Sequence, residues 1–393
     1  MHIGVVAPEF PPELGGMQTY AVEFVRALAA RGHTVTVFTR TGPDTEAGIP
    51  GVEVRRVLRE RRHADRAILA TPGIDAWHVM NACYAWVAAE VAPVVISVHG
   101  NDFLDPYLPV ERPNLGRIPL LWKSDSLRPT IEYWLARPLT RRSVARNLPR
   151  ARAILANSRY TADVLLAQLP ACRGKVIPAM VGVSPAFFDV QPGPRLHPDM
   201  ELVTVCRLDE RRKNIDQVLR ALAQLAPDHA FNYRVVGEGA RRTELQALAA
   251  ELGIADRVEF TGRLAFDALR SALARADLFV LAASIEQGSH EGFGIAYIEA
   301  NAAGTPVLAA RLAGAAEAVD EGRSGLFVDD TDVTSLVGAL RKVLSGELRF
   351  DPETCRAFAR RFSWDSVVEQ ALPFYGVDAP RSDPTQNTAG QAA

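Results

Sequence analysis

The sequence is poor in cysteine and lysine, and it has no long uninterrupted apolar run. It has only four cysteines in 393 residues, which lie far apart at Cys83, Cys172, Cys206 and Cys355. This spacing fits no zinc motif and predicts buried, reduced thiols rather than a disulfide framework. Only four of the 44 basic residues are lysine. The formal net charge of −2 gives no global basic field of the kind that attracts nucleic acid.

Signals for export and membrane insertion are also missing. The N-terminal stretch MHIGVVAPEF has no basic segment followed by an apolar core, so we predict no signal peptide. No run of ~18 apolar residues could cross a bilayer. A chain that is 48% hydrophobic can nevertheless build about two domains with real cores. We therefore expect a cytoplasmic protein, either free or bound peripherally at the inner membrane face.

The first half alternates strand-like and helix-like segments. Residues 3–7 form an apolar strand pattern, residues 19–31 have helical periodicity and residues 34–38 form the next strand pattern. Further buried strands are predicted at 77–80, 94–98 and 153–156. Strands separated by helices indicate a parallel sheet.

The alternation restarts after a proline-rich stretch. We assign residues 1–183 to a first domain, 184–200 to a linker and 201–362 to a second parallel α/β domain. Strands are predicted at 201–206, 232–236, 258–260, 278–281 and 307–310, and helices at 214–225, 241–252, 267–274 and 294–303. Two doubly wound sheets would face one cleft with the ends of their strands, where ligands bind in such folds. Residues 377–393 are polar and predict a disordered tail.

Two glutamates define the strongest local motif. Glu299 follows Glu291 by eight residues, a little over two helical turns, in the segment EGFGIAYIE. If the helix begins near Gly294, Glu291 lies at its mouth and Glu299 points from its body toward roughly the same side. The first turn would then offer unpaired N–H groups to a phosphate. A surface helix that follows a glycine turn is the alternative interpretation.

A basic segment, RLDERRKN, follows the first strand of the second half. Arg207 and Lys213 within it could together neutralise a diphosphate without a metal ion. A solvated basic loop is the alternative. Against it, Lys213 is one of few lysines in a chain that otherwise uses arginine, which favours a compact point charge at this position.

These segments, together with VVGEG at 235–239 and PPELGG at 11–16, resemble family-4 glycosyltransferases over nearly the whole chain to about Tyr375. The resemblance implies a GT-B fold, with two Rossmann-like doubly wound parallel-sheet domains facing a central cleft. It implies retention of anomeric configuration and no metal or cofactor, with a nucleotide-diphosphate sugar as co-substrate. The second domain would bind this donor and the first a glycan, lipid-linked or small-molecule acceptor. Residues 363–376 resemble the helix that crosses back to pack on the first domain.

The resemblance also assigns roles to single residues. Arg207 and Lys213 would hold the donor phosphates, Glu291 the sugar hydroxyls and Glu299 the ribose. The remaining donor contacts would come from backbone at Phe293, Gly294, Ile295, Gly15 and Gly16. His99, after the strand VVISV, matches the family's active-site histidine near the C6 hydroxyl of the donor sugar. A structural histidine at a strand end is the alternative for His99.

Other signals are weaker. Gly237 and Gly239 lack the third glycine of a dinucleotide fingerprint, so an oxidoreductase is disfavoured. Asp330-Thr-Asp332 spells the DxD of metal-dependent transferases, but it lies in a polar loop, and we predict no metal site there. The linker entry, 181–184, and the loop around Ala313 depart from common family usage. A sugar-nucleotide epimerase with a GT-B fold and an inactive sugar-nucleotide-binding module stay open as alternatives to a transferase.

The last feature is a stretch of arginines on the acceptor side. Residues 137–152 contain six arginines and no acid. An apolar and aromatic run precedes them, including Leu120, Leu121, Trp122, Tyr133, Trp134 and Leu135. If residues 130–147 form a helix, its cations can face anionic headgroups while the aromatics lie at the interface. The sequence thus indicates peripheral membrane contact through residues 130–152, with a solvated arginine-rich face as the alternative.

Overall fold

A computed structural model of the chain describes residues 1–12, 15–42, 48–113, 115, 127–190 and 199–376, with the backbone alone for 127–129. The predicted tail, 377–393, lies outside the described residues, as do residues 191–198 of the predicted linker.

The first half of the chain builds a seven-stranded parallel sheet with the order β3-β2-β1-β4-β5-β6-β7. Its strands are β1 His2–Val6, β2 Thr34–Arg40, β3 Val52–Leu58, β4 Ala76–Val79, β5 Val94–Val98, β6 Ala153–Ala156 and β7 Val176–Pro178. The central strands β1, β4 and β5 are mostly apolar and almost entirely buried, because both faces of a parallel sheet are covered. The sequence pattern missed the two edge strands. β3 mixes arginine with valine, and β7 has only three residues.

The second half builds a six-stranded parallel sheet with the order β10-β9-β8-β11-β12-β13. Its strands are β8 Met200–Val205, β9 Phe231–Val236, β10 Val258–Gly262, β11 Leu278–Leu281, β12 Val307–Ala310 and β13 Gly325–Val328. Only β13, another edge strand, was not predicted. The order switches between β1 and β4 in the first sheet and between β8 and β11 in the second, and such switch points are where doubly wound folds bind ligands.

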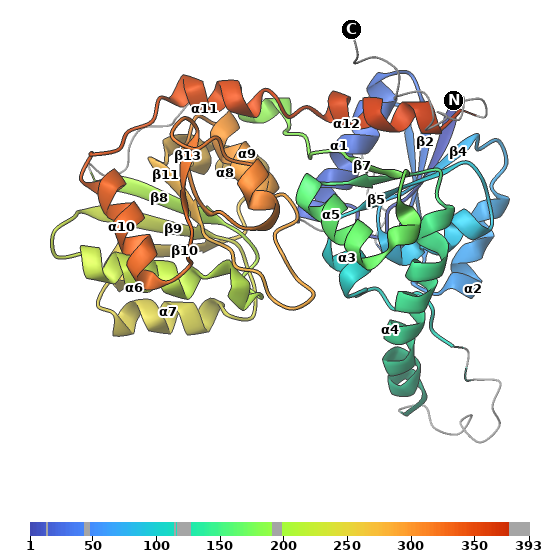
Figure 1. Cartoon of the computed structure of the whole chain (residues 1–393), viewed down its shortest axis with the longest axis horizontal. Helices are drawn as coiled ribbons and strands as arrows, with labels where there is room; N and C mark the ends of the chain where they lie inside the picture. The colour runs from blue at the N-terminus through green and yellow to red at the C-terminus, as the bar shows by residue number, and fades with distance from the viewer. Residues whose placement is uncertain (13–14, 43–47, 114, 116–126, 191–198, 377–393) are drawn as a thin grey trace, which may run out of the picture.

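Helices connect the strands and cover both sheets (Figure 1). In the first half they are α1 Gly16–Ala30, α2 Arg62–Asp65, α3 Asn101–Leu104, α4 Leu127–Asn147 and α5 Arg159–Gln168. The second half holds α6 Ile215–Leu225, α7 Arg242–Glu251, α8 Phe266–Arg275, α9 Ile295–Ala302, α10 Val333–Leu344, α11 Pro352–Ala359 and α12 Trp364–Ala371. The four helices predicted in the second half are all present, with ends within a residue of those expected.

The chain crosses back to the first sheet after α11. In Figure 1, α12 lies against α1, and Arg31 of α1 forms ion pairs with Asp365 and Glu369. Tyr375, one of the last described residues, is fully buried. The two crossings between the halves touch, because the Val183 N–H donates to the Phe362 carbonyl over 3.2 Å.

Candidate donor-sugar site

The basic segment after β8 contains a short turn that ends at a residue with a positive φ. Residues Arg211–Lys213 form a short 3-10 turn that ends at Asn214, whose φ is 54°. Asparagine tolerates this left-handed conformation better than most side chains. The Asn214 side chain also donates to the Ala282 carbonyl over 2.8 Å, which ties the turn to the end of β11. Side chains from the turn are thereby directed toward the loop that precedes α9.

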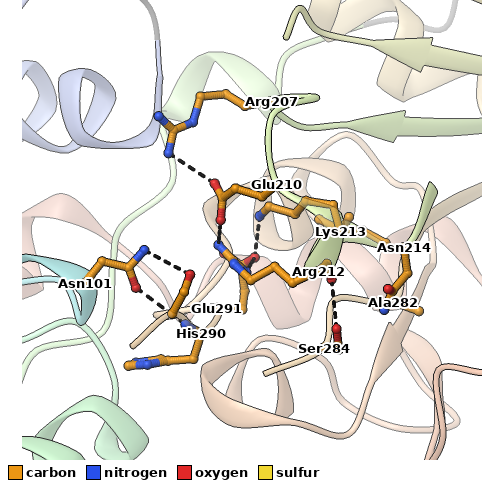
Figure 2. Close-up of polar contacts among 12 residues, drawn as sticks. Asn101, Arg207, Glu210, Arg212, Lys213, Asn214, Ala282, Ser284, His290 and Glu291 are labelled. Carbon is orange, nitrogen blue, oxygen red and sulfur yellow. Dashed lines mark hydrogen bonds and ion pairs between the residues drawn. The ribbon is translucent and has the colours of Figure 1, made fainter. Parts of the chain in front are cut away.

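Glu291 receives two cations from this turn. Its Oε2 lies 2.6 Å from Lys213 Nζ and 3.3 Å from a terminal nitrogen of Arg212 (Figure 2). Burial alone would raise the pKa of Glu291, but the two cations outweigh it and lower the pKa to about 2. Glu291 is therefore an ionised carboxylate in a fixed position at the mouth of α9.

Arg212 is the residue that the sequence interpretation missed. Its side chain is 5% exposed and bridges Glu291 and Glu210, the latter over 2.6 Å. Three consecutive basic residues stand at 211–213, and nothing in their order shows which one the turn buries. The neighbouring Arg211 is 75% exposed.

Arg207 does not lie beside Lys213. Its guanidinium is 69% exposed and pairs with Glu210 over 3.3 Å. Figure 2 shows that the two predicted phosphate ligands are joined through a chain of alternating charges: Arg207, Glu210, Arg212, Glu291 and Lys213. Of the two predicted phosphate ligands, Arg207 is therefore the outer, exposed cation and Lys213 the inner, buried one.

The start of α9 follows the prediction. Gly294 precedes the helix with a φ of +87°, and a Cβ there would lie 2.2 Å from the Tyr297 ring, so only glycine fits. Phe293 is buried against Phe362, with ring centroids 5.4 Å apart. No side chain caps the helix at Gly294, and Ile295 opens its first turn.

Glu299 lies on the buried side of α9 and is 8% exposed. Burial and the charge of Glu23, which belongs to α1 in the first half, raise the pKa of Glu299 to about 8. The two glutamates of the motif thus have opposite environments: Glu291 among cations, and Glu299 near another carboxylate. Nothing in the sequence had indicated that Glu23 lies near Glu299.

His99 lies at the carboxyl end of β5. Its backbone N–H donates to Asp102 over 2.9 Å, and its ring meets the edge of Tyr20 at 4.5 Å. The ring hydrogen-bonds to the backbone of Met80, while Nε2 is buried without a partner in the described structure. Burial lowers the pKa of His99 to about 4, so near neutral pH Nε2 is a free hydrogen-bond acceptor.

Gly15 and Gly16 lie at the start of α1, close after β1, with Gly15 in the capping position. They therefore belong to the same carboxyl edge of the first sheet as His99. The rest of the PPELGG loop includes residues 13–14, which are outside the described part.

Contacts between the two halves surround the motif. Glu317, from the loop after β12, accepts backbone N–H groups of Arg159 and Tyr160 at the start of α5, over 3.0 and 2.9 Å. His290 packs against the Tyr160 ring with centroids 5.1 Å apart. Thr161 donates to the Gly292 carbonyl over 3.3 Å. The residue next to Glu291 is thus held by the opposite half, which the sequence did not indicate.

The DxD sequence at 330–332 has a local structural role. Asp332 caps α10 by accepting the Ser335 N–H, which is a local role for the second residue of the DxD sequence. Within the described residues, no three His, Cys, Asp or Glu side chains gather as a metal site would need. In the same part of the chain, no helix combines the length and the apolar character that crossing a membrane requires.

Solved structures show the same architecture. Sucrose-phosphate synthase from Thermosynechococcus elongatus superposes with a TM-score of 0.74 at 21% identity, covering 95% of this chain and 98% of that one. HepE from Anabaena in complex with UDP-glucose gives 0.70 at 19% identity, with 95% and 98% covered. The two facing parallel sheets therefore define a GT-B protein, as the resemblance implied.

Sequence comparison identifies the family. The model described as Glycosyltransferase Family 4 matches residues 14–184, and that described as Glycosyl transferases group 1 matches residues 192–362. A D-inositol 3-phosphate glycosyltransferase from Acidothermus cellulolyticus is 29% identical, with 92% of this chain and 86% of the relative covered. A GDP-mannose-dependent alpha-(1-6)-phosphatidylinositol monomannoside mannosyltransferase from Mycolicibacterium smegmatis is 28% identical, with 90% of each covered. The chain belongs to the family-4 glycosyltransferases and is a glycosyltransferase enzyme.

Proposed function

We propose that the chain is a retaining hexosyltransferase that needs no metal ion. It moves the sugar of a nucleotide-diphosphate sugar onto a glycan, lipid-linked or small-molecule acceptor. The observation that carries this proposal is the buried cluster of Lys213, Arg212 and Glu291 at the mouth of α9. Cations fixed beside a helix start can stabilise the charge that develops on a departing diphosphate, which a metal would otherwise do.

The proposal assigns each donor contact to a residue of this arrangement. Lys213 and Arg207 hold the diphosphate, with the backbone of residues 293–295 on one side and Gly15-Gly16 on the other. Glu299 accepts from the ribose.

The sugar itself lies between Glu291 and His99. Glu291 accepts hydrogen bonds from its hydroxyls, and Nε2 of His99 accepts another. Because its pKa of about 4 makes His99 a weak base, it orients the sugar and does not take up the proton. The acceptor hydroxyl attacks the anomeric carbon on the face from which the diphosphate leaves, and its proton passes to the leaving phosphate oxygen.

The named relatives support acceptors that carry many hydroxyl groups. Their names give D-inositol 3-phosphate and a phosphatidylinositol monomannoside as acceptors. The relatives are transferases, so the epimerase alternative gains no support from them.

The test starts with a thermal-shift screen of GDP-mannose, UDP-glucose and UDP-N-acetylglucosamine. A donor at ~100 times its dissociation constant stabilises the protein by ~2.7 kcal/mol. Transfer of the sugar from the donor that this screen identifies is then followed by NMR of the anomeric proton, with and without excess EDTA. We expect the donor's anomeric configuration in the product and unchanged turnover in EDTA. An inverted product would refute retention, and turnover that returns only with magnesium or manganese would refute metal independence.

We further propose that α4 contacts an anionic membrane surface. The predicted helix is present, and Figure 1 shows it extending away from the rest of the first half. Trp134 is 74% exposed and Tyr133 56% exposed. Arg141 and Arg142 are also exposed on this helix. Residues 120–122 of the apolar run lie outside the described structure.

This combination suits a lipid interface. Aromatic side chains favour the headgroup boundary, and each nearby arginine contributes up to ~1 kcal/mol toward an anionic surface. Co-sedimentation with anionic vesicles should weaken when Trp134 becomes Ala or when Arg141, Arg142 and Arg146 become Gln. Phe266→Ala, which removes an exposed aromatic from α8, is the matched control. Equal binding to neutral and anionic vesicles would favour the solvated arginine-rich face.

A further inference from the structure

Three polar side chains that the proposed donor site does not use meet at the carboxyl edge of the first sheet. Glu9 follows β1, Asn81 follows β4 and Tyr107 comes after β5 and α3. The Tyr107 hydroxyl donates to Glu9 Oε2 over 2.5 Å. Asn81 Nδ2 lies 2.8 Å from the Tyr107 hydroxyl and 3.4 Å from the same Glu9 oxygen. Parallel strands with neighbouring ends bring these residues together although they are far apart in sequence.

Asn81 is the buried member of this cluster and Tyr107 is its most exposed member. Asn81 is fully buried, and its side-chain oxygen accepts the Cys83 N–H over 2.9 Å. Tyr107, in contrast, is 43% exposed, and its ring has no aromatic partner among the described residues. Glu9 is partly buried, and within the described structure the hydrogen bonds from Tyr107 and Asn81 both go to its Oε2. The cluster therefore combines a partly exposed tyrosine with a carboxylate whose second oxygen takes no part in these hydrogen bonds.

Asp102 joins the cluster to the turn that carries His99, because it accepts the N–H groups of Ala82, next to Asn81, and of His99, each over 2.9 Å. Burial raises the pKa of Glu9, while Arg207 of the other half is close enough to lower it in part. Asp102, which fixes the His99 backbone, lies close enough to raise it. Glu9 is thus within electrostatic reach both of the outer donor cation and of the turn that carries His99.

An aromatic face beside an anchored carboxylate matches a ring that bears hydroxyl groups. The C–H bonds of such a ring pack on an aromatic face, and two neighbouring hydroxyls can donate to a carboxylate in charge-assisted hydrogen bonds. A phosphate in the same place would be repelled by Glu9. We propose that Glu9, Tyr107 and Asn81 form an acceptor subsite for a neutral hydroxylated ring, a sugar or a cyclitol. This inference rests on the proposed transferase function.

The binding test uses methyl α-D-mannopyranoside and myo-inositol as probes. With the full chain and saturating GDP or UDP, saturation-transfer NMR should detect ring protons of at least one probe. Because hydrogen bonds to charged groups are strong, Glu9→Gln should raise its dissociation constant ~10–100-fold. Tyr107→Ala, which removes the ring face, should raise it as well. The controls are Glu53→Gln on β3 and Phe266→Ala on α8, and neither should change the dissociation constant.

The kinetic test separates this inference from the proposed function. In Glu9→Gln and Tyr107→Ala, the KM for the probe should rise, while the donor KM and the acceptor-independent hydrolysis of the donor stay within about twofold. Absence of donor binding in the unmodified protein would refute the proposed function. The subsite is refuted if the donor binds but neither probe gives a signal. It is equally refuted if both variants match their controls while keeping the unmodified protein's melting temperature.

Discussion

The ammonium group of Lys213 lies 2.6 Å from a carboxylate oxygen of Glu291, although 77 residues separate them in the sequence. The pair joins the turn after β8 to the loop before α9, and Arg212 forms a second ion pair with Glu291. The charge of Lys213 is therefore balanced by the ionised carboxylate of Glu291. In the proposed donor complex, the diphosphate would share Lys213 with this carboxylate, and the ion pair fixes both side chains.

Removal of either predicted phosphate ligand should impair catalysis. Loss of one preorganised charge at a developing oxyanion costs ~10²–10³-fold in kcat. We expect Lys213→Ala and Arg207→Ala to lose at least that much turnover with the best donor. Steady-state kinetics would measure the loss, and Arg211→Ala, which removes an exposed cation from the same turn, is the control. Near-normal turnover in both variants would assign the segment to the solvated surface.

The two glutamates of the motif should separate in their effects. Glu291→Gln should lower kcat and the discrimination between donor sugars, because its carboxylate is proposed to hold the transferring sugar. Glu299→Gln should mainly weaken nucleotide binding, since ribose contacts are equal in the ground and transition states. Titration of free nucleoside diphosphate by calorimetry distinguishes them. Stronger loss of nucleotide affinity in Glu291→Gln than in Glu299→Gln would overturn the assignment.

Glu299 should also make stability depend on pH. Its pKa is about 8 in the folded protein against an ordinary value of 4.5, so between these values the folded state keeps a proton that the unfolded state releases. The associated stability is complete below pH 4.5 and is lost as the pH rises through 8. Relative to Glu299→Gln, the melting temperature of the unmodified protein without ligand should therefore fall between pH 5 and pH 8.5. Glu259→Gln, at an exposed carboxylate on β10, is the control. If the melting temperatures of Glu299→Gln and the unmodified protein changed equally with pH, the raised pKa of Glu299 would be contradicted.

Two glycines should respond to alanine in opposite ways. At Gly294, φ is +87° and a Cβ would lie 2.2 Å from Tyr297, so Gly294→Ala should lower the free energy of unfolding by ~1–3 kcal/mol. Gly338 lies within α10 and a Cβ there meets nothing within 4 Å. Gly338→Ala should raise the free energy of unfolding by ~0.5–1 kcal/mol. Urea denaturation measures both, and a Gly294→Ala protein as stable as the parent would show that α9 can start in another way.

The regular elements were largely predictable because the patterns that form them are local. The central strand β11 is a continuous apolar run and β5 is apolar except for Ser97, and the helix at residues 215–225 repeats its apolar positions at the helical period. The edge strand β3 was not predicted because its charged residues, Glu53, Arg55 and Arg56, resemble a polar connection. Its pairing partner, β2, decides that it is a strand.

The sequence by itself determined the two parallel α/β sheets, the helix that begins after Gly294 and the segments that would carry the donor site. All of these follow from neighbours within a few positions, through apolar periodicity and glycine conformation. Only the tertiary structure decided that Arg212 is buried while Arg211 is exposed, that Glu291 lies among cations and that Glu299 lies near Glu23. Burial and charge neighbours are set by segments far apart in the chain. They therefore exist only after the two sheets have packed, and they fix the ionisation of the groups that the proposed chemistry needs.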